Sequence, residues 1–314
     1  MASATPLPLR ILASFHTLFY APLHVAHRLG GFAEEGLGAR IAFSPQASET
    51  ADRLLAGEAD LAVCGPMRSY VAADRAAPRR LINIAEVNSR DGFFLLARRP
   101  ANGFRWPDLA GRRVILFAEA PTPWMCLQDV LRRHGVDPQE ITVLRGLPVP
   151  QALEVFRAGG ADYLQTAQPM TEELLAEGRA YLAAAMGEVV GPVPYTALVV
   201  TAEFRQANPK LCRRAVGALT KALRWMARHD PPAIANLIAP DFPAIPSPLI
   251  RGVVARYQAM GMWPPQPILA REPFERLGRI LADGGLIRRV APYESLVDNT
   301  LAEAALDALG AHSP

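Results

Sequence analysis

A helical pattern gives way to a strand pattern in the stretch Leu54-Leu55-Ala56-Gly57-Glu58-Ala59-Asp60-Leu61-Ala62. Glycine can adopt the left-handed conformation that ends many helices, and the apolar run after Asp60 has the length and composition of a short strand. A similar stretch recurs as Phe156-Arg157-Ala158-Gly159-Gly160-Ala161-Asp162. The two stretches predict a repeated helix–glycine–strand unit, and the same offset aligns residues 10–15 with residues 112–117.

The segments around these two stretches alternate in the same way. Apolar runs typical of strands occur at 9–15, 39–43, 61–64, 81–87, 92–98, 113–117, 141–144 and 163–166. Helical spacing of apolar residues occurs between them, at 21–32, 48–56, 124–134 and 150–158. This alternation predicts an α/β protein with doubly wound, mostly parallel sheets. After residue 208 the patterns are helical, at 209–229, 247–260, 272–283 and 294–309, and predict a helical C-terminal tail.

The chain has 314 residues, which is more than one compact domain usually contains. We therefore expect two lobes with a ligand cleft between them. Residues 1–99 and 196–314 are predicted to form lobe 1, with the helical tail completing it. Residues 100–195 are predicted to form lobe 2.

Composition excludes several classes of partner. Half of the residues are apolar, a fifth are charged and the net charge is +3, with no basic block of the kind that binds nucleic acid. The apolar runs are far shorter than the roughly 20 residues of a transmembrane helix. Cys64, Cys126 and Cys212 are too far apart to form a disulfide framework, so we expect buried thiols. We expect a monomer.

The N-terminal residues bear on localisation. Residues 1–9 contain two prolines and lack the basic region and apolar core of a secretory signal. Two expectations stay open: a cytoplasmic protein as the sequence is written, or a periplasmic protein whose presequence was removed.

Four segments together resemble a known family. They are Phe19–Leu37, with its Gly31-Phe32-Ala33-Glu34-Glu35-Gly36-Leu37 ending, the two glycine stretches quoted above, and Asp108-Leu109-Ala110-Gly111-Arg112-Arg113-Val114. Their order and spacing are similar to those of the substrate-binding proteins of ABC importers for nitrate, sulfonates, taurine and thiamine-pyrimidine precursors. The resemblance implies a type II periplasmic-binding-protein fold, in which two α/β lobes close on a ligand.

The resemblance also implies which loops line the cleft, because ligands bind at strand carboxyl ends in such lobes. The predicted ligand-binding residues are His16, Thr17, Phe19, Tyr20, Gly65, Arg68, Tyr70, Glu119, Thr122, Trp124, Gln168 and Tyr195. Relatives that bind oxyanions often carry a Gly-Ser or Ser-Thr pair where this chain has Pro121-Thr122-Pro123-Trp124. Proline has no N–H to donate.

Four aromatic residues of this set, Phe19, Tyr20, Tyr70 and Trp124, favour a flat or aromatic organic ligand, although a sulfonate-like ligand stays open. Stacking on Trp124 is expected to matter more than the charge of Arg68. Glu86 and Glu119 are expected at strand ends facing the cleft, where a carboxylate could bind an amine.

Enzymes on the same scaffold are the alternative. The yeast-type pyrimidine synthase uses a cysteine-rich motif and a lysine, but Lys210 and Lys221 fall in the helical tail. The aromatic sulfinate desulfinase uses a cysteine in the loop after the first strand, whereas the nearest thiol here is Cys64. We therefore expect a binding protein for ABC-type import or sensing, with a small-molecule ligand, an ABC permease as partner and no cofactor. A cytoplasmic enzyme on this scaffold remains the second hypothesis.

A metal site is the last alternative. His24 and His27 are spaced like two ligands on one helix face, with His16 close in sequence. The prediction is a solvated helix face and no metal.

Overall fold

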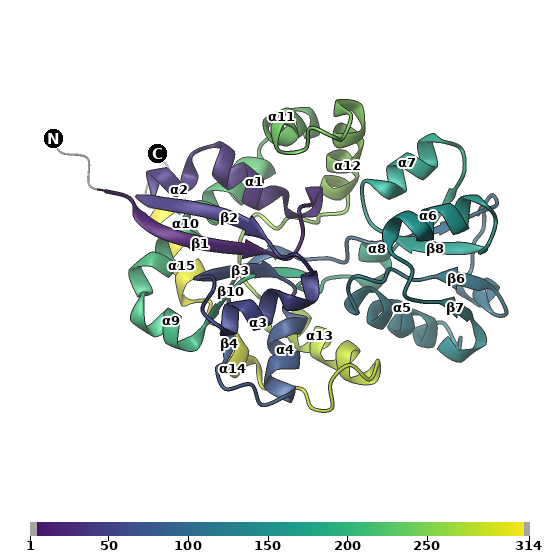
Figure 1. Ribbon diagram of the computed structural model, residues 1–314, viewed down its shortest axis with the longest axis horizontal. Helices are drawn as coiled ribbons and strands as arrows, with labels where there is room; N and C mark the ends of the chain where they lie inside the picture. Colours follow the sequence, from purple (N-terminus) through teal and green to yellow (C-terminus); the bar gives the residue numbers. More distant parts are fainter. Residues whose placement is uncertain (1–4, 311–314) are drawn as a thin grey trace.

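Two five-stranded sheets organise the computed structural model, which describes residues 5–310 (Figure 1). The strand order of the first sheet is β2 (Leu37–Phe43), β1 (Leu7–Ala13), β3 (Leu61–Cys64), β10 (Thr196–Thr201) and β4 (Leu81–Asn88). The order of the second is β7 (Thr142–Leu144), β6 (Arg113–Ile115), β8 (Tyr163–Thr166), β5 (Phe94–Ala97) and β9 (Tyr181–Ala185). We call the parts built on these sheets lobe 1 and lobe 2. The predicted α/β class with a sheet in each lobe is confirmed.

Helices surround each sheet. In lobe 1 they are α1 (Ala21–Arg28), α2 (Gly31–Glu34), α3 (Thr50–Leu55), α4 (Met67–Asp74), α9 (Ala202–Ala207), α10 (Pro209–Ala227), α11 (Pro231–Ile238), α12 (Ser247–Ala259), α13 (Arg271–Asp283), α14 (Tyr293–Leu296) and α15 (Thr300–Gly310). In lobe 2 they are α5 (Thr122–Arg133), α6 (Val149–Arg157), α7 (Met170–Ala176) and α8 (Met186–Val190). Short 3-10 turns lie at Leu18–Tyr20, Ala47–Glu49, Trp106–Leu109, Pro138–Glu140 and Ala239–Asp241. No helix within residues 5–310 is both long and apolar enough to cross a membrane.

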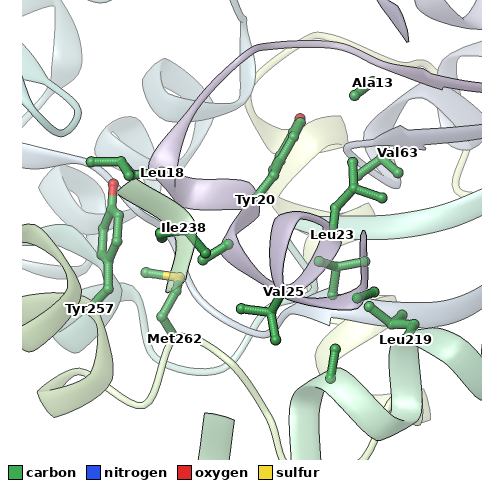
Figure 2. Packing of buried hydrophobic residues seen from close by; sticks show 14 of the residues in the cluster. Ala13, Leu18, Tyr20, Leu23, Val25, Val63, Leu219, Ile238, Tyr257 and Met262 are labelled. Carbon is green, nitrogen blue, oxygen red and sulfur yellow. The ribbon is translucent and has the colours of Figure 1, made fainter. Parts of the chain in front are cut away.

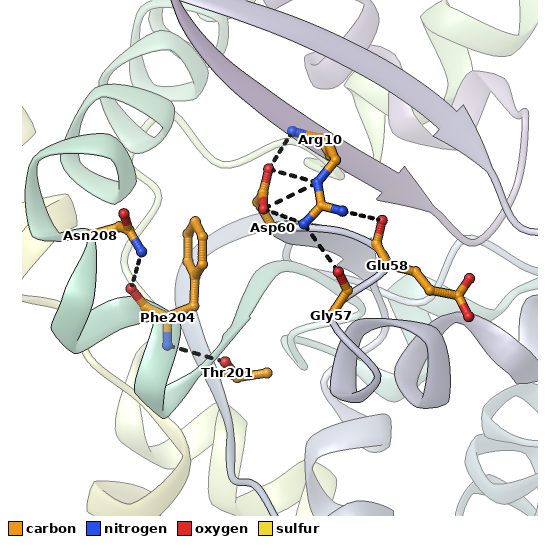
Figure 3. Close-up of polar contacts among 7 residues, drawn as sticks. All are labelled: Arg10, Gly57, Glu58, Asp60, Thr201, Phe204 and Asn208. Carbon is orange, nitrogen blue, oxygen red and sulfur yellow. Dashed lines mark hydrogen bonds and ion pairs between the residues drawn. The ribbon is translucent and has the colours of Figure 1, made fainter.

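The repeated unit predicted from the glycine stretches is present in both sheets. Asp60 accepts a hydrogen bond from the backbone N–H of Arg10 at 2.8 Å, next to an Arg10–Asp60 ion pair (Figure 3). Asp162 accepts from the backbone N–H of Arg113 at 3.0 Å in the same way. Arg113 is therefore the counterpart of Arg10, so the predicted alignment with Arg112 is wrong by one residue.

Each sheet contains one antiparallel strand that enters from the crossing between the lobes. β5 runs antiparallel to β8 and β9, and β10 runs antiparallel to β3 and β4. The other four strands of each sheet run in one direction, so the prediction of mostly parallel sheets is confirmed. A boundary at Arg99 would leave β5 with lobe 1, whereas its pairing puts the first crossing between Asn88 and Phe94. β4 and β5 are nearly continuous in sequence and both buried, so burial pattern alone could not separate them.

The helical C-terminal segment packs on lobe 1, as predicted. Figure 2 shows Tyr20, Leu23 and Val25 from the first helical turns among side chains from α10, α11 and α12. These include Leu219, Ile238 and Tyr257, each exposed by 2% or less. Such burial removes large apolar areas from water and anchors the loop that precedes Tyr20. The tail therefore holds one wall of the cleft in place.

Candidate functional site

A cleft lies where the strand carboxyl ends of the two sheets face one another. It has an inner compartment of about 250 Å³ and an outer compartment of about 870 Å³. The two share residues from both lobes, which are Ser14, Phe15, His16, Phe117, Glu119, Ala120 and Pro121. The inner compartment is near the lower size limit of pockets that enclose small organic ligands.

Aromatic rings are prominent on the inner wall. The ring of Phe19 meets those of Tyr195 and Tyr257 at centroid distances of 6.0 and 5.7 Å. The backbone around Phe19 is fixed as well, because its carbonyl accepts hydrogen bonds from Asn88 Nδ2 at 3.0 Å and Trp263 Nε1 at 3.2 Å. Further rings on this wall belong to Phe15, Phe93, Phe117 and Phe242. These preset rings suit an apolar, flat ligand.

Hydroxyl groups form the polar part of the inner wall in lobe 1. Burial raises the pKa of Tyr20, whose hydroxyl lies beside those of Ser14 and Thr196. Thr196 is 1% exposed and its Oγ1 makes no hydrogen bond of standard geometry among residues 5–310. The buried hydroxyl of Tyr195 lies beside the carboxyl of Asp91 and likewise makes no bond of standard geometry within the described part of the chain. Buried polar groups are normally paired, so these hydroxyls mark a place where a ligand could bond.

Few charged groups line the inner compartment, and one of them already makes a hydrogen bond within the protein. Arg68 donates to the Ser48 carbonyl at 3.2 Å. Glu119 is exposed at the edge of the cleft. On the lobe 2 side, Thr122 opens α5 and Pro123 follows it, which removes one N–H donor from the helix start. The compartment is therefore poorly equipped for a bare anion.

Ten of the twelve predicted residues line the inner compartment, and these are His16, Thr17, Phe19, Tyr20, Gly65, Arg68, Glu119, Thr122, Gln168 and Tyr195. Trp124 lines the outer compartment instead, where the guanidinium carbon of Arg145 lies 4.8 Å from the centre of its ring. Tyr70 lines neither compartment. It is fully buried against Phe274 and donates to the Phe274 carbonyl at 2.9 Å.

Replacing Tyr70 with phenylalanine should therefore affect stability and not the cleft. Loss of this buried hydrogen bond should lower the free energy of unfolding by about 0.5–1.5 kcal/mol. Urea unfolding of the variant measures this loss. A change in ligand affinity without a loss of stability would show that Tyr70 belongs to the site after all.

Several wall residues escaped the sequence prediction. Ser14, Phe93, Thr196, Phe242 and Tyr257 all line the inner compartment. Phe242 and Tyr257 come from the helical tail, whose packing on the cleft no local pattern reveals. Ser14 and Thr196 lie at the end of β1 and the start of β10, so the strand boundaries could have indicated them.

The histidines do not behave as a solvated pair. His27 is exposed, but His24 is buried and its Nδ1 lies 3.1 Å from Asp241 Oδ2, so the predicted solvated face is wrong for His24. Burial lowers the pKa of His24 to about 4, because an apolar surrounding disfavours the charged ring. Within residues 5–310 no group of three or more His, Cys, Asp or Glu side chains is arranged to hold a metal ion.

Two other candidates for chemistry are also buried. Burial raises the pKa of the Cys64 thiol to about 11, which keeps the sulfur protonated and poorly nucleophilic near neutral pH. Glu86 lines neither compartment, so its predicted position facing the cleft is wrong. It lies in β4, where every residue is buried, and is itself 7% exposed.

Comparison with known proteins gives a consistent picture. The model of the NMT1-like family matches residues 11–239. YtlA of Bacillus subtilis, which is named as a binding protein, is 28% identical over 289 residues, covering 92% of this chain and 86% of YtlA.

Solved structures share the fold at low sequence identity. The alkanesulfonate-binding protein SsuA from Xanthomonas axonopodis pv. citri, solved with MOPS, matches with a TM-score of 0.72 and 20% identity, over 95% of this chain and all of that chain. The desulfurization enzyme DszB matches with a TM-score of 0.69 and 16% identity, over 96% and 99% of the two chains. The fold therefore accommodates both binding and catalysis.

Proposed function

Because the chain belongs to the NMT1-like family, we propose that it is a substrate-binding protein that closes around a small organic ligand for ABC-type import or sensing. The observation that carries the proposal is the aromatic inner compartment between the strand ends of the two lobes. Ligands bind at this position in open α/β sheets. YtlA and SsuA are binding proteins by name, in line with this reading.

The ligand we propose is a flat, largely apolar molecule with one polar end. Aromatic rings would enclose the flat part, and the hydroxyls of Tyr20, Tyr195 and Thr196 would bind the polar end. Arg68 is already bonded to a carbonyl, and the start of α5 is depleted of N–H donors by Pro123. An aromatic or heterocyclic compound fits this chemistry better than nitrate or a small aliphatic sulfonate does.

Catalysis is the second candidate, favoured by the shared fold with DszB. The loop after β1 offers His16 and Thr17 and no thiol, and Cys64 is buried with a pKa raised to about 11. A nucleophilic cysteine needs a lowered pKa and access to the substrate. We therefore place the protein among the binders, acting as a monomer with an ABC permease as its partner.

The proposal predicts stacking-dominated binding. In calorimetry with nitrate, MOPS and biphenyl-2-sulfinate as probes, the flat aromatic probe should bind most tightly, with an affinity that changes little with added salt. Phe117→Ala removes a ring from the inner wall and should weaken this binding by about threefold to tenfold, because a stacked aromatic pair contributes about 0.5–1.5 kcal/mol, whereas Trp124→Ala, in the outer compartment, should change it little. Arg68→Ala should weaken it less than Phe117→Ala does.

The reverse order would indicate an anion site: tightest binding of nitrate or MOPS, a steep loss with salt and a larger effect of Arg68→Ala. Native mass spectrometry of the purified protein would identify a retained ligand directly. Turnover of that compound by the protein alone would favour the enzyme instead.

A further inference from the structure

One ion pair joins the two lobes at the side of the cleft. Among the ion pairs of residues 5–310, Arg256–Glu172 is the one whose partners lie in different lobes. Arg256 is on α12 of lobe 1 and Glu172 is on α7 of lobe 2. Their side chains are 31% and 16% exposed, so water screens this pair less than it screens a fully exposed ion pair.

Glu172 also fixes the orientation of a side chain in the inner compartment. Gln168 is 2% exposed and lines that compartment. Its Oε1 accepts from the backbone N–H of Glu172 at 3.2 Å, and its Nε2 donates to Glu172 Oε1 at 3.1 Å. A backbone N–H can only donate, so the amide oxygen must face it and the amide cannot be flipped. One N–H and one lone pair of the amide remain for another partner.

We propose that Glu172 is a positioning residue that serves two purposes with one carboxylate. The same oxygen, Oε1, holds the Gln168 amide at the cavity wall and ties α7 to Arg256 on lobe 1. The Gln168 amide and the contact between the lobes thus share one acceptor oxygen. The role in ligand recognition rests on the proposed function. Holding the Gln168 amide and joining the two lobes do not depend on it, and both can be measured without a ligand.

The first experiment measures lobe separation. Gln46 and Gln139 are exposed on lobe 1 and lobe 2 and can be replaced with cysteine for spin labels, since Cys64, Cys126 and Cys212 are buried. In double electron–electron resonance, Glu172→Gln and Arg256→Gln should each shift the distance distribution to longer values. The unsubstituted pair should show the same shift at about 1 M salt, where the Debye length is about 3 Å. Exchanging the two residues, Glu172→Arg with Arg256→Glu, should restore the shorter distances.

A matched control exists inside lobe 2. Arg157 and Glu177 form an ion pair with side chains 34% and 39% exposed, so Arg157→Gln removes a comparable pair that does not cross the cleft. It should leave the distances unchanged. Distances unaffected by Glu172→Gln, or shifted equally by Arg157→Gln, would overturn the tie between lobes.

The second experiment follows the Gln168 amide by NMR, with its side-chain resonance assigned by its loss in Gln168→Glu. Glu172→Ala removes the acceptor and should speed exchange of these amide protons at least tenfold. Glu172→Gln keeps an acceptor oxygen and should preserve slow exchange. Equal exchange rates in Glu172→Ala and the parent protein would refute the positioning role, whether or not any ligand is ever found.

Discussion

Glu86→Gln should stabilise the protein at alkaline pH by on the order of 3–5 kcal/mol, with little effect near pH 5. Burial raises the pKa of Glu86 to about 8, because the residue is only 7% exposed and no charged or hydrogen-bonding group within residues 5–310 offsets the loss of water. Between the ordinary value of 4.5 and about 8, the folded state keeps a proton that the unfolded state has released. Stability must therefore fall as pH rises through this window and level off above it.

Urea unfolding from about pH 5 to about pH 9 measures the effect. Asp91 is also buried, with a pKa raised to about 7, so Glu86→Gln should remove part of the slope and leave the part due to Asp91. Glu140 is exposed, and Glu140→Gln serves as the control that should leave the curve unchanged. Parallel curves for Glu86→Gln and the parent protein would mean that the carboxyl is ionised and solvated in the fold.

The fold was predictable because its signals are local and repeated. Each glycine stretch specifies a helix end and a strand start, and the two stretches occupy equivalent places in the two sheets. The lobe to which β5 belongs was not predictable, since strand pairing is a long-range contact between segments that look alike. The counterpart of Arg10 also required the hydrogen bonds of Asp60 and Asp162 to fix the register.

The site was predictable where it consists of loops that follow strands. His16, Phe19 and Gln168 fall in such loops and reach the inner compartment. The prediction that Tyr70 lines the cleft failed because Tyr70 lies inside α4, two residues after Arg68. This spacing is about 200° around a helix, so the two side chains leave opposite faces. Phe242 and Tyr257 escaped because the tail reaches the cleft by packing, which sequence periodicity does not record.

Thr196→Val should have opposite effects on stability and on binding. Within residues 5–310 the buried hydroxyl of Thr196 has no hydrogen bond of standard geometry, so replacing it with a methyl group of similar shape should raise the free energy of unfolding by about 1–2 kcal/mol. If the polar end of the ligand bonds this hydroxyl, the same change should weaken binding by about threefold to tenfold. Urea unfolding of the empty protein and calorimetry with its retained ligand measure the two effects.

The same strand supplies the control. Thr201, at the other end of β10, is also buried, but its Oγ1 accepts from the backbone N–H of Phe204 at 3.2 Å and caps α9 (Figure 3). Thr201→Val should therefore lower the free energy of unfolding by about 1 kcal/mol and leave ligand affinity unchanged. Changes of opposite sign in the free energy of unfolding would show that the Thr201 hydroxyl stabilises the fold and that the Thr196 hydroxyl does not. Equal destabilisation would mean that Thr196 has a structural partner and that the inner compartment recognises its ligand by other groups.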